Sequence, residues 1–183
     1  VQGLHNEEID AAFIRSPVAD VVALTVRPLL QEKMVVALPK GHPLAGGGRK
    51  KKAAQSRTAP LPLADLATET FILYKRPGGP GLYDTIITAC RGAGFSPHVG
   101  QEAPRIISTL NLVAAGLGVS LVPESLRRLQ MDGVVYRKLA DNAQLTAPLI
   151  LACRRGENAA SVQRFIDLVQ STAEHIEADT ELR

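Results

Sequence analysis

The pattern of apolar and polar residues predicts strands and helices that alternate at the lengths typical of α/β proteins. An apolar helical stretch stops at Gly116, the chain turns again at Gly118, and the apolar run 119–122 ends at Pro123. This order predicts a helix, a tight turn and a short buried strand. The buried stripe of this helix is expected to be Ile106, Leu110, Val113 and Leu117.

Other segments also show the apolar patterns of strands or of helices. The apolar run 9–14 is typical of a parallel strand buried on both faces, and it delivers Arg15 at its carboxyl end. Such strand ends are where α/β sheets usually meet their ligands. Further strands are expected at 21–26, 34–38, 71–74, 99–103, 134–139 and 149–153, and helices at 63–66, 82–93 and 124–129. A last helix, capped by Asn158, is expected to bury Val162, Phe165, Ile166, Val169, Ala173 and Ile176.

Composition indicates a folded domain without a nucleic-acid surface. The chain has 183 residues, 45% of them apolar, and its net charge of +3 is concentrated in the low-complexity segment 46–60, which we interpret as a solvated loop. With 4% aromatic residues and no tryptophan, nothing favours a base-stacking surface. Because no signal peptide or membrane-length apolar run is found, we expect a cytoplasmic protein without membrane association.

The loop Gly78–Gly81 is the first candidate for chemistry, since it opens the helix 82–93. Gly79 and Gly81 allow a ligand to approach the backbone closely. The expected N-cap position carries no Ser, Thr, Asp or Asn, so the first helical N–H groups lack an evident partner. A bound anion would satisfy them and meet the positive end of the helix dipole, although water or a local turn would also serve.

Arg15 is the second candidate, because a guanidinium group binds a carboxylate bidentately and suits recognition of an organic acid. The alternative is a structural salt bridge to Asp10, Glu102 or a partner chain. The start of the next helix, 101–105, is also poorly capped. Arg105 could be a second partner for an anion there, or simply a solvated residue of the first turn.

Hydroxyl groups near these helices could also face a ligand. Ser108 and Thr109 could offer hydroxyls or bond back to their own helix, and Tyr74 and Tyr83 could line a pocket or belong to the core. Catalysis has little support, because there is no nucleophile elbow and no acid/base pair. The two cysteines and four histidines show no metal-ligand spacing. We therefore expect no catalytic residue, no metal and no cofactor.

Three segments resemble, in order and spacing, the effector-binding module of LysR-type transcriptional regulators. They are Ile9–Arg15, Lys33–Pro39 with His42-Pro43-Leu44, and Leu112–Pro123. The resemblance covers almost the whole chain, and only 46–57 reads as an insertion. The strand 71–74 and the loop containing Pro80 look most like the branch that responds to aromatic compounds such as benzoate or muconate.

This resemblance implies a periplasmic-binding-protein-like α/β fold, in which two subdomains are joined by two crossover strands with the effector between them. Residues 31–145 would form a complete second subdomain. Residues 1–30 and 146–183 would form a partial first subdomain, because the strand–helix–strand unit that normally opens it is missing. The winged helix-turn-helix of the family is also absent from this sequence.

The resemblance also implies where the effector would bind. In the aromatic-responsive branch, the remaining wall of the cleft would be the loop 79–82 and the residues near Glu102 and Arg105. Arg15 matches an arginine associated with a second, more buried acid-binding spot. Leu82 stands where some relatives carry an aromatic residue. The candidate effector-binding residues are therefore Arg15, Gly79, Pro80, Gly81, Leu82, Glu102 and Arg105.

The expected function is the sensing of a small organic acid, a carboxylate, by a regulator that is a homodimer or higher homo-oligomer. DNA would be bound only through an N-terminal domain outside this sequence. A solute-binding protein of the same fold class is the alternative, and it would require an export signal upstream. An enzyme on a similar scaffold would need a convergent nucleophile or acid/base pair, which is not found.

Overall fold

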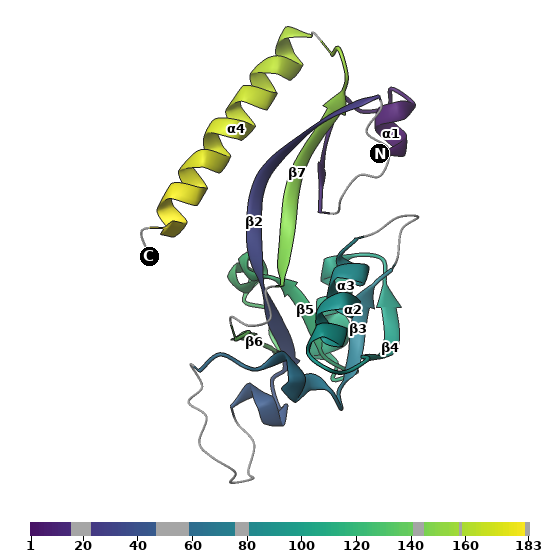
Figure 1. Ribbon diagram of the computed structural model, residues 1–183, viewed down its shortest axis with the longest axis vertical. Coiled ribbons are helices and arrows are strands. Elements are labelled where there is room, and N and C mark those ends of the chain that lie inside the picture. Colours follow the sequence, from purple (N-terminus) through teal and green to yellow (C-terminus); the bar gives the residue numbers. More distant parts are fainter. Residues whose placement is uncertain (16–22, 47–58, 76–80, 141–144, 158, 182–183) are drawn as a thin grey trace. The chain divides into compact units, whose positions relative to one another are not determined.

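The computed structural model describes residues 1–15, 23–46, 59–75, 81–140, 145–157 and 159–181 (Figure 1). The chain divides into two compact units. Unit 1 comprises Val1–Gln31 and Ala147–Arg183, and unit 2 comprises Glu32–Thr146. Strand β2 (Leu24–Pro39) begins in unit 1 and ends in unit 2. Among the helices described, none is long and apolar enough to cross a membrane.

Unit 1 is a small antiparallel sheet covered by a long helix. Strand β1 (Ala11–Ile14) pairs with β7 (Thr146–Arg154), which is followed in the sheet by β2. Helix α1 (Gln2–His5) precedes β1, and helix α4 (Ala160–Glu181) lies beside β2 and β7 (Figure 1). The core of this layer consists of Leu29, Leu151, Cys153, Val162, Ile166 and Ala173.

Several predictions for unit 1 are wrong. Strand β1 is an antiparallel edge strand rather than a parallel strand buried on both faces, and the side chain of Phe13 is 54% exposed. The described part of the strand expected at 21–26 and the strand expected at 34–38 both belong to the single strand β2, whereas residues 21 and 22 lie outside the described residues. Pro28 lies within β2 where, among the described strands of unit 1, β7 alone flanks it, and an edge strand tolerates proline.

The last helix is confirmed, but its buried stripe is narrower than predicted. Val162, Ile166 and Ala173 are buried, whereas Phe165 and Ile176 are more than 40% exposed. The first of these, Phe165, packs edge-on against Phe13, with ring centroids 6.2 Å apart. The proposed cap at position 158 lies outside the described residues.

The strands of unit 2 form two groups: β5 and β6 both pair with β2, and β3 pairs with β4 in a separate two-stranded sheet. Strand β3 is parallel to β4, and a Phe71–Val119 bridge joins β3 to the start of β5. Both β5 and β6 are antiparallel to β2. The new strands are β3 (Thr70–Tyr74), β4 (His98–Ala103), β5 (Ser120–Pro123) and β6 (Val134–Lys138). The helices are α2 (Leu82–Gly92), α3 (Ile106–Ala114), and the 3-10 helices η1 (Pro43–Ala45), η2 (Leu63–Leu66) and η3 (Glu124–Leu129).

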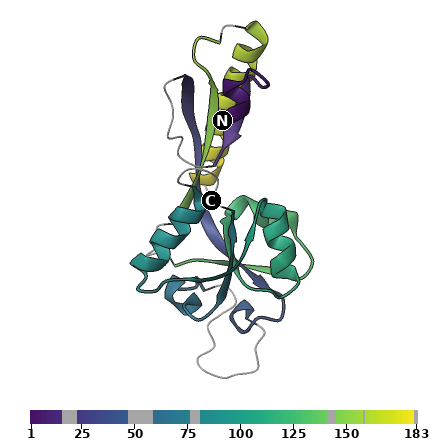
Figure 2. The same cartoon turned by 90° about the vertical axis from the view of Figure 1, so that its right-hand side faces the viewer.

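The two α-helices of unit 2 lie on opposite faces of the parallel strands (Figure 2). The chain moves outward from β3 through α2 to β4, and then returns through α3 to β5 on the other side of β3. Because such connections are right-handed, the reversal places the helices on different faces. Strand β3 is consequently covered on both sides, and Phe71, Ile72 and Leu73 are fully buried.

The glycine turns predicted from the sequence are confirmed. Helix α3 ends at Ala114, Gly116 follows with φ 79°, and Gly118 has φ 157°. A Cβ atom at Gly118 would lie 2.4 Å from the carbonyl oxygen of Thr70, so this position requires glycine. The prediction for Leu117 is wrong, since this side chain lies beyond the helix and is 51% exposed.

Candidate functional site

The candidate site lies at the carboxyl ends of the parallel strands β3 and β4. These ends are neighbours, because Tyr74 is in register with Ala103 and the Lys75 amide donates to the Ala103 carbonyl at 2.8 Å. After β3 the chain leads to helix α2, and after β4 it leads to helix α3. The amino termini of two helices therefore follow adjacent strand ends, which is the usual ligand-binding edge of an α/β sheet.

Both helices begin without a side-chain cap. The N-cap of α2 is Gly81 and that of α3 is Arg105, and neither position has a side chain that accepts from the first turn. The hydroxyls of Thr85 and Thr109 donate to the carbonyls of these same N-cap residues, at 3.1 and 3.2 Å. Since the hydroxyls donate to carbonyls, they do not cap the first-turn N–H groups, which keep a positive partial charge at the edge.

Charged side chains surround this edge. Glu102 and Arg105 are exposed at the end of β4 and the start of α3, and Lys75 is exposed directly after β3. Asp84 lies in the first turn of α2. Sequence reasoning missed Lys75, because its importance follows from the β3–β4 register rather than from any local motif.

The structure describes five of the seven candidate residues. Gly81 has an extended conformation, with φ −156° and ψ −162°, so it is not the strained turn position for which glycine is needed. The side chain of Leu82 is only 9% exposed and belongs to the core. Gly79 and Pro80 lie outside the described residues. The role of the whole set in effector binding stays a prediction.

Arg15 belongs to unit 1, whereas the other candidates belong to unit 2. That these residues share one site therefore stays a prediction. Asp10, one suggested salt-bridge partner of Arg15, binds Arg154 at 2.5 Å. Arg154 also contacts Glu157 at 2.6 Å and donates to the Ile9 carbonyl, which ties the start of β1 to the end of β7. Hydrogen bonds from Arg154 to both carboxylates raise its pKa.

The hydroxyl candidates divide between the core and the surface. Thr109 is buried and bonds back to its helix, as the alternative interpretation held. Tyr74 is buried, and its hydroxyl donates to the Leu121 carbonyl at 2.8 Å. Ser108 and Tyr83 are partly exposed. Within the described ranges, no group of three or more His, Cys, Asp or Glu side chains could hold a metal ion.

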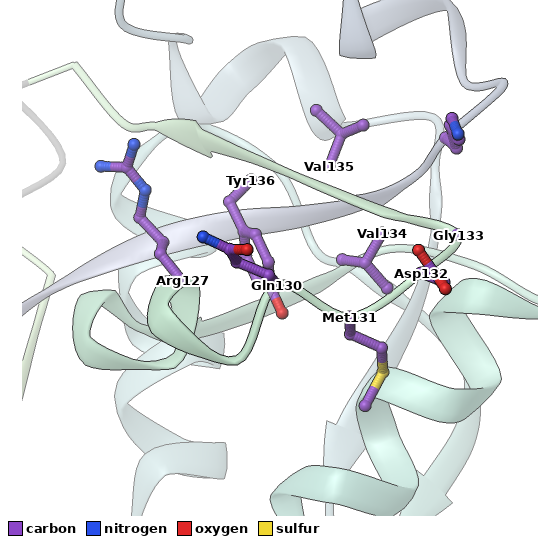
Figure 3. A pocket seen from close by; sticks show the side chains of 9 residues that line it. Arg127, Gln130, Met131, Asp132, Gly133, Val134, Val135 and Tyr136 are labelled. Atoms are coloured by element: carbon purple, nitrogen blue, oxygen red, sulfur yellow. The ribbon is translucent and has the colours of Figure 1, made fainter.

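A hollow of about 370 Å³ lies in another part of unit 2, beside η3 and β6 (Figure 3). Tyr136 borders it next to Gln130, and the Tyr136 hydroxyl is buried without a hydrogen-bond partner among the described residues. Burial raises the pKa of this phenol. None of the predicted site residues lines this hollow. Its lining consists of Lys40, Arg127, Gln130, Met131, Asp132, Gly133, Val134, Val135 and Tyr136.

Comparison with known proteins identifies the relatives of the chain. A family model, the LysR substrate binding domain, matches residues 1–174. The HTH-type transcriptional regulator CatR of Pseudomonas putida is 35% identical over 174 residues, which cover 95% of this chain and 55% of the relative. BudR of Raoultella terrigena, another HTH-type transcriptional regulator, is 31% identical over 168 residues, which cover 92% of this chain and 54% of BudR. The chain thus spans about half the length of these relatives, which are regulators rather than enzymes.

Solved structures show the same fold. The BenM effector binding domain with its effector benzoate is 27% identical, with a TM-score of 0.74, over 100% of this chain and 75% of that one. The effector binding domain of QuiR in complex with shikimate has a TM-score of 0.75 at 20% identity, over 95% of this chain and 76% of the QuiR chain. The predicted periplasmic-binding-protein-like α/β fold is thereby confirmed. By its family match, its relatives and its fold, the chain belongs to the LysR substrate binding domain family.

Proposed function

We propose that this chain is the sensing module of a LysR-type transcriptional regulator and that it binds a small organic carboxylate. The observation that carries the proposal is the pair of uncapped helix starts at the adjacent ends of β3 and β4. First-turn N–H groups and the helix dipole favour a negative charge at such a place. The benzoate bound by the BenM domain is an anion of this class.

The roles of individual residues follow from the charges at this edge. Arg105 would bind the carboxylate as a guanidinium fork, and Lys75 would add a second positive charge. The negative charge of Glu102 repels an anion, so Glu102 would favour an effector that also carries a hydrogen-bond donor. Arg15 would contact a second acid-binding spot in unit 1. Unit 1 would correspond to the predicted first subdomain, 1–30 with 146–183. Unit 2 would correspond to the predicted second subdomain, 31–145.

Binding would regulate transcription through the rest of a longer protein. The curated relatives are HTH-type regulators about twice as long as this chain, so DNA would be bound outside this sequence and the protein would act in the cytoplasm. An effector controls such a protein only if it binds two arrangements with different affinities, by about 1–3 kcal/mol in typical cases. The relatives favour this function over that of a solute-binding protein.

Substitution of Arg105 by aspartate tests the proposed site. Arg105 has φ −139° and ψ 148°, the extended geometry in which an aspartate caps a helix. We expect Arg105→Asp to stabilise α3 by about 1 kcal/mol and to weaken benzoate binding at least tenfold, or about 1.4 kcal/mol. A variant that became more stable yet lost its ligand could not be explained by misfolding.

Isothermal titration calorimetry with benzoate and shikimate would measure the affinities, with benzamide as the uncharged control. Arg128→Asp is the matched variant, because Arg128 is exposed on η3 and its substitution changes the net charge equally. We expect Arg128→Asp to bind like the original chain. Equal losses in both variants, or benzamide binding as tightly as benzoate, would refute the proposed site.

A second copy of the chain is the proposed macromolecular partner. Strand β1 is a sheet edge that carries Phe13, and Phe165 of α4 packs against Phe13. The side chains of Phe13, Phe165 and, also on α4, Leu168 are 54%, 41% and 64% exposed. An exposed edge next to apolar side chains favours association. Sedimentation velocity should show a dimer or larger form, and monomer alone across micromolar concentrations would contradict this.

A further inference from the structure

Strands β3 and β5 begin as a parallel pair that does not continue as a ladder. At the Phe71–Val119 bridge, the Val119 amide donates to the Thr70 carbonyl and the Ile72 amide donates to the Val119 carbonyl, each at 2.8 Å. A regular parallel ladder would next use the carbonyls of Ile72 and Leu121 as acceptors for main-chain amides. Strand β3 instead pairs along its length with β4.

Two side-chain hydroxyls take these two carbonyls. The Ser120 hydroxyl donates to the Ile72 carbonyl at 2.7 Å, and the Tyr74 hydroxyl donates to the Leu121 carbonyl at 2.8 Å. Both hydrogen bonds are buried. Among the described residues, the main-chain pairing of β3 with β5 stops at the Phe71–Val119 bridge, and these two hydroxyls join the strands beyond it.

The second of these hydroxyl bonds lies at the edge already identified as the candidate site. Tyr74 is the last residue of β3, next to Ala103 at the end of β4, and the chain continues from there into α2. The helical connections also change from one face of the sheet to the other at the β3–β5 pair, and open α/β sheets bind ligands at such points.

We propose that Tyr74 and Ser120 are positioning residues of the effector site: their hydroxyls fix the separation of β3 and β5, and with it the position of the first turn of α2. This inference rests on the proposed function for its ligand but not for its geometry. Phenylalanine at position 74 keeps the apolar ring and releases the Leu121 carbonyl. The strand ends then lose their fixed separation although the core stays filled.

The chain supplies a matched control for this substitution. Tyr74 and Tyr136 both place a buried hydroxyl in unit 2, but only the Tyr74 hydroxyl has a protein acceptor. Tyr74→Phe and Tyr136→Phe therefore delete the same atom from a bonded and from an unbonded position. A third variant, Ile166→Val in unit 1, removes a buried methyl group and serves as a control for a general loss of stability.

Calorimetry with benzoate and hydrogen exchange of the amides 85–87, which begin the hydrogen-bonded part of α2, would be measured on all three variants. We expect Tyr74→Phe to weaken benzoate binding about tenfold, the equivalent of one ordinary hydrogen bond, and to speed exchange at 85–87 selectively. Tyr136→Phe and Ile166→Val should do neither. Ser120→Ala should shift both readouts in the same direction as Tyr74→Phe.

The results separate this inference from the proposed function. If the original chain binds no benzoate, the proposed ligand class is wrong, and the exchange rates at 85–87 alone decide the role of Tyr74. If benzoate binds equally well to the chain and to Tyr74→Phe, the hydroxyl is merely structural and the inference is overturned. Unchanged exchange at 85–87 in the folded Tyr74→Phe variant would overturn it as well.

Discussion

Replacement of Gly118 by alanine tests the close approach of β5 to β3. Gly118 directly precedes the residue that bridges the two strands, and its φ of 157° is rare for residues with a side chain. A Cβ atom at this position would lie 2.4 Å from the Thr70 oxygen and 3.2 Å from the Thr70 carbonyl carbon. These atoms belong to the main chain of a buried strand, so they cannot turn aside as a flexible side chain would.

The size of the effect follows from this overlap. Position 118 must move about 1 Å away from Thr70 before an ordinary van der Waals contact is restored. The two bridging hydrogen bonds, each 2.8 Å long, then stretch beyond bonding range. Their loss costs about 0.5–1.5 kcal/mol each, and a positive φ adds about 1–2 kcal/mol. We expect Gly118→Ala to destabilise the chain by about 2–5 kcal/mol.

Denaturant unfolding would measure the free energy, and hydrogen exchange of the Val119 and Ile72 amides would locate the damage. Gly116→Ala is the control, because Gly116 also has a positive φ, but among the described residues no atom beyond its chain neighbours lies within 4 Å of its Cβ position. Gly116→Ala should lower the free energy of unfolding by only about 1–2 kcal/mol, which is the cost of the positive φ alone. The steric reasoning fails if the unfolding free energies of the two variants agree within about 0.5 kcal/mol and Gly118→Ala leaves hydrogen exchange at Val119 unchanged.

Three further predictions concern buried polar groups. Tyr136→Phe should leave the stability unchanged or raise it by up to about 1 kcal/mol, because it removes an unpaired hydroxyl; a loss above about 1 kcal/mol in denaturant unfolding would contradict this. Arg137→Met should cost about 2–4 kcal/mol by the same assay, because the buried guanidinium donates to the carbonyls of Leu44 and Ala59; a cost below about 1 kcal/mol would contradict the assignment. Burial raises the pKa of the Cys90 thiol from 9.0 to about 11, so its contribution to stability is full below pH 9 and is lost toward pH 11. Cys90→Ala should flatten this alkaline decline in unfolding curves, and iodoacetamide should label native Cys90 at pH 8 no faster than global unfolding allows.

The sequence predicted best what depends on neighbouring residues. Helix α2 begins at Leu82 as predicted and ends one residue early, at Gly92. Gly94, with φ 90°, closes the turn after it. An amphipathic stripe and a terminating glycine are local signals, and they hold in any tertiary context. In α3 the burial of Leu110 and Val113 is likewise predicted, whereas Ile106 is partly exposed.

The errors in prediction concern contacts between distant segments. An apolar run such as 9–14 looks the same in a parallel and an antiparallel sheet, and only its pairing with β7, more than 130 residues away, decides the matter. The prediction of two short strands in place of β2 has the same origin, because the continuity of β2 depends on its pairing with β7, β5 and β6. In each case the local pattern was correct, and the position of the strand within its sheet decided the outcome.

The candidate site combines both kinds of information. The missing caps of α2 and α3 are visible in the sequence, whereas the adjacency of their starts depends on the register of Tyr74 with Ala103. One uncapped helix start is easily satisfied by water, so alone it predicts no ligand. Two such starts follow adjacent strands at one sheet edge, next to the carbonyl bonded by the Tyr74 hydroxyl. A carboxylate has two oxygen atoms with which to meet two sets of amides, and this match of geometry is the strongest physical reason to expect an acid as the effector.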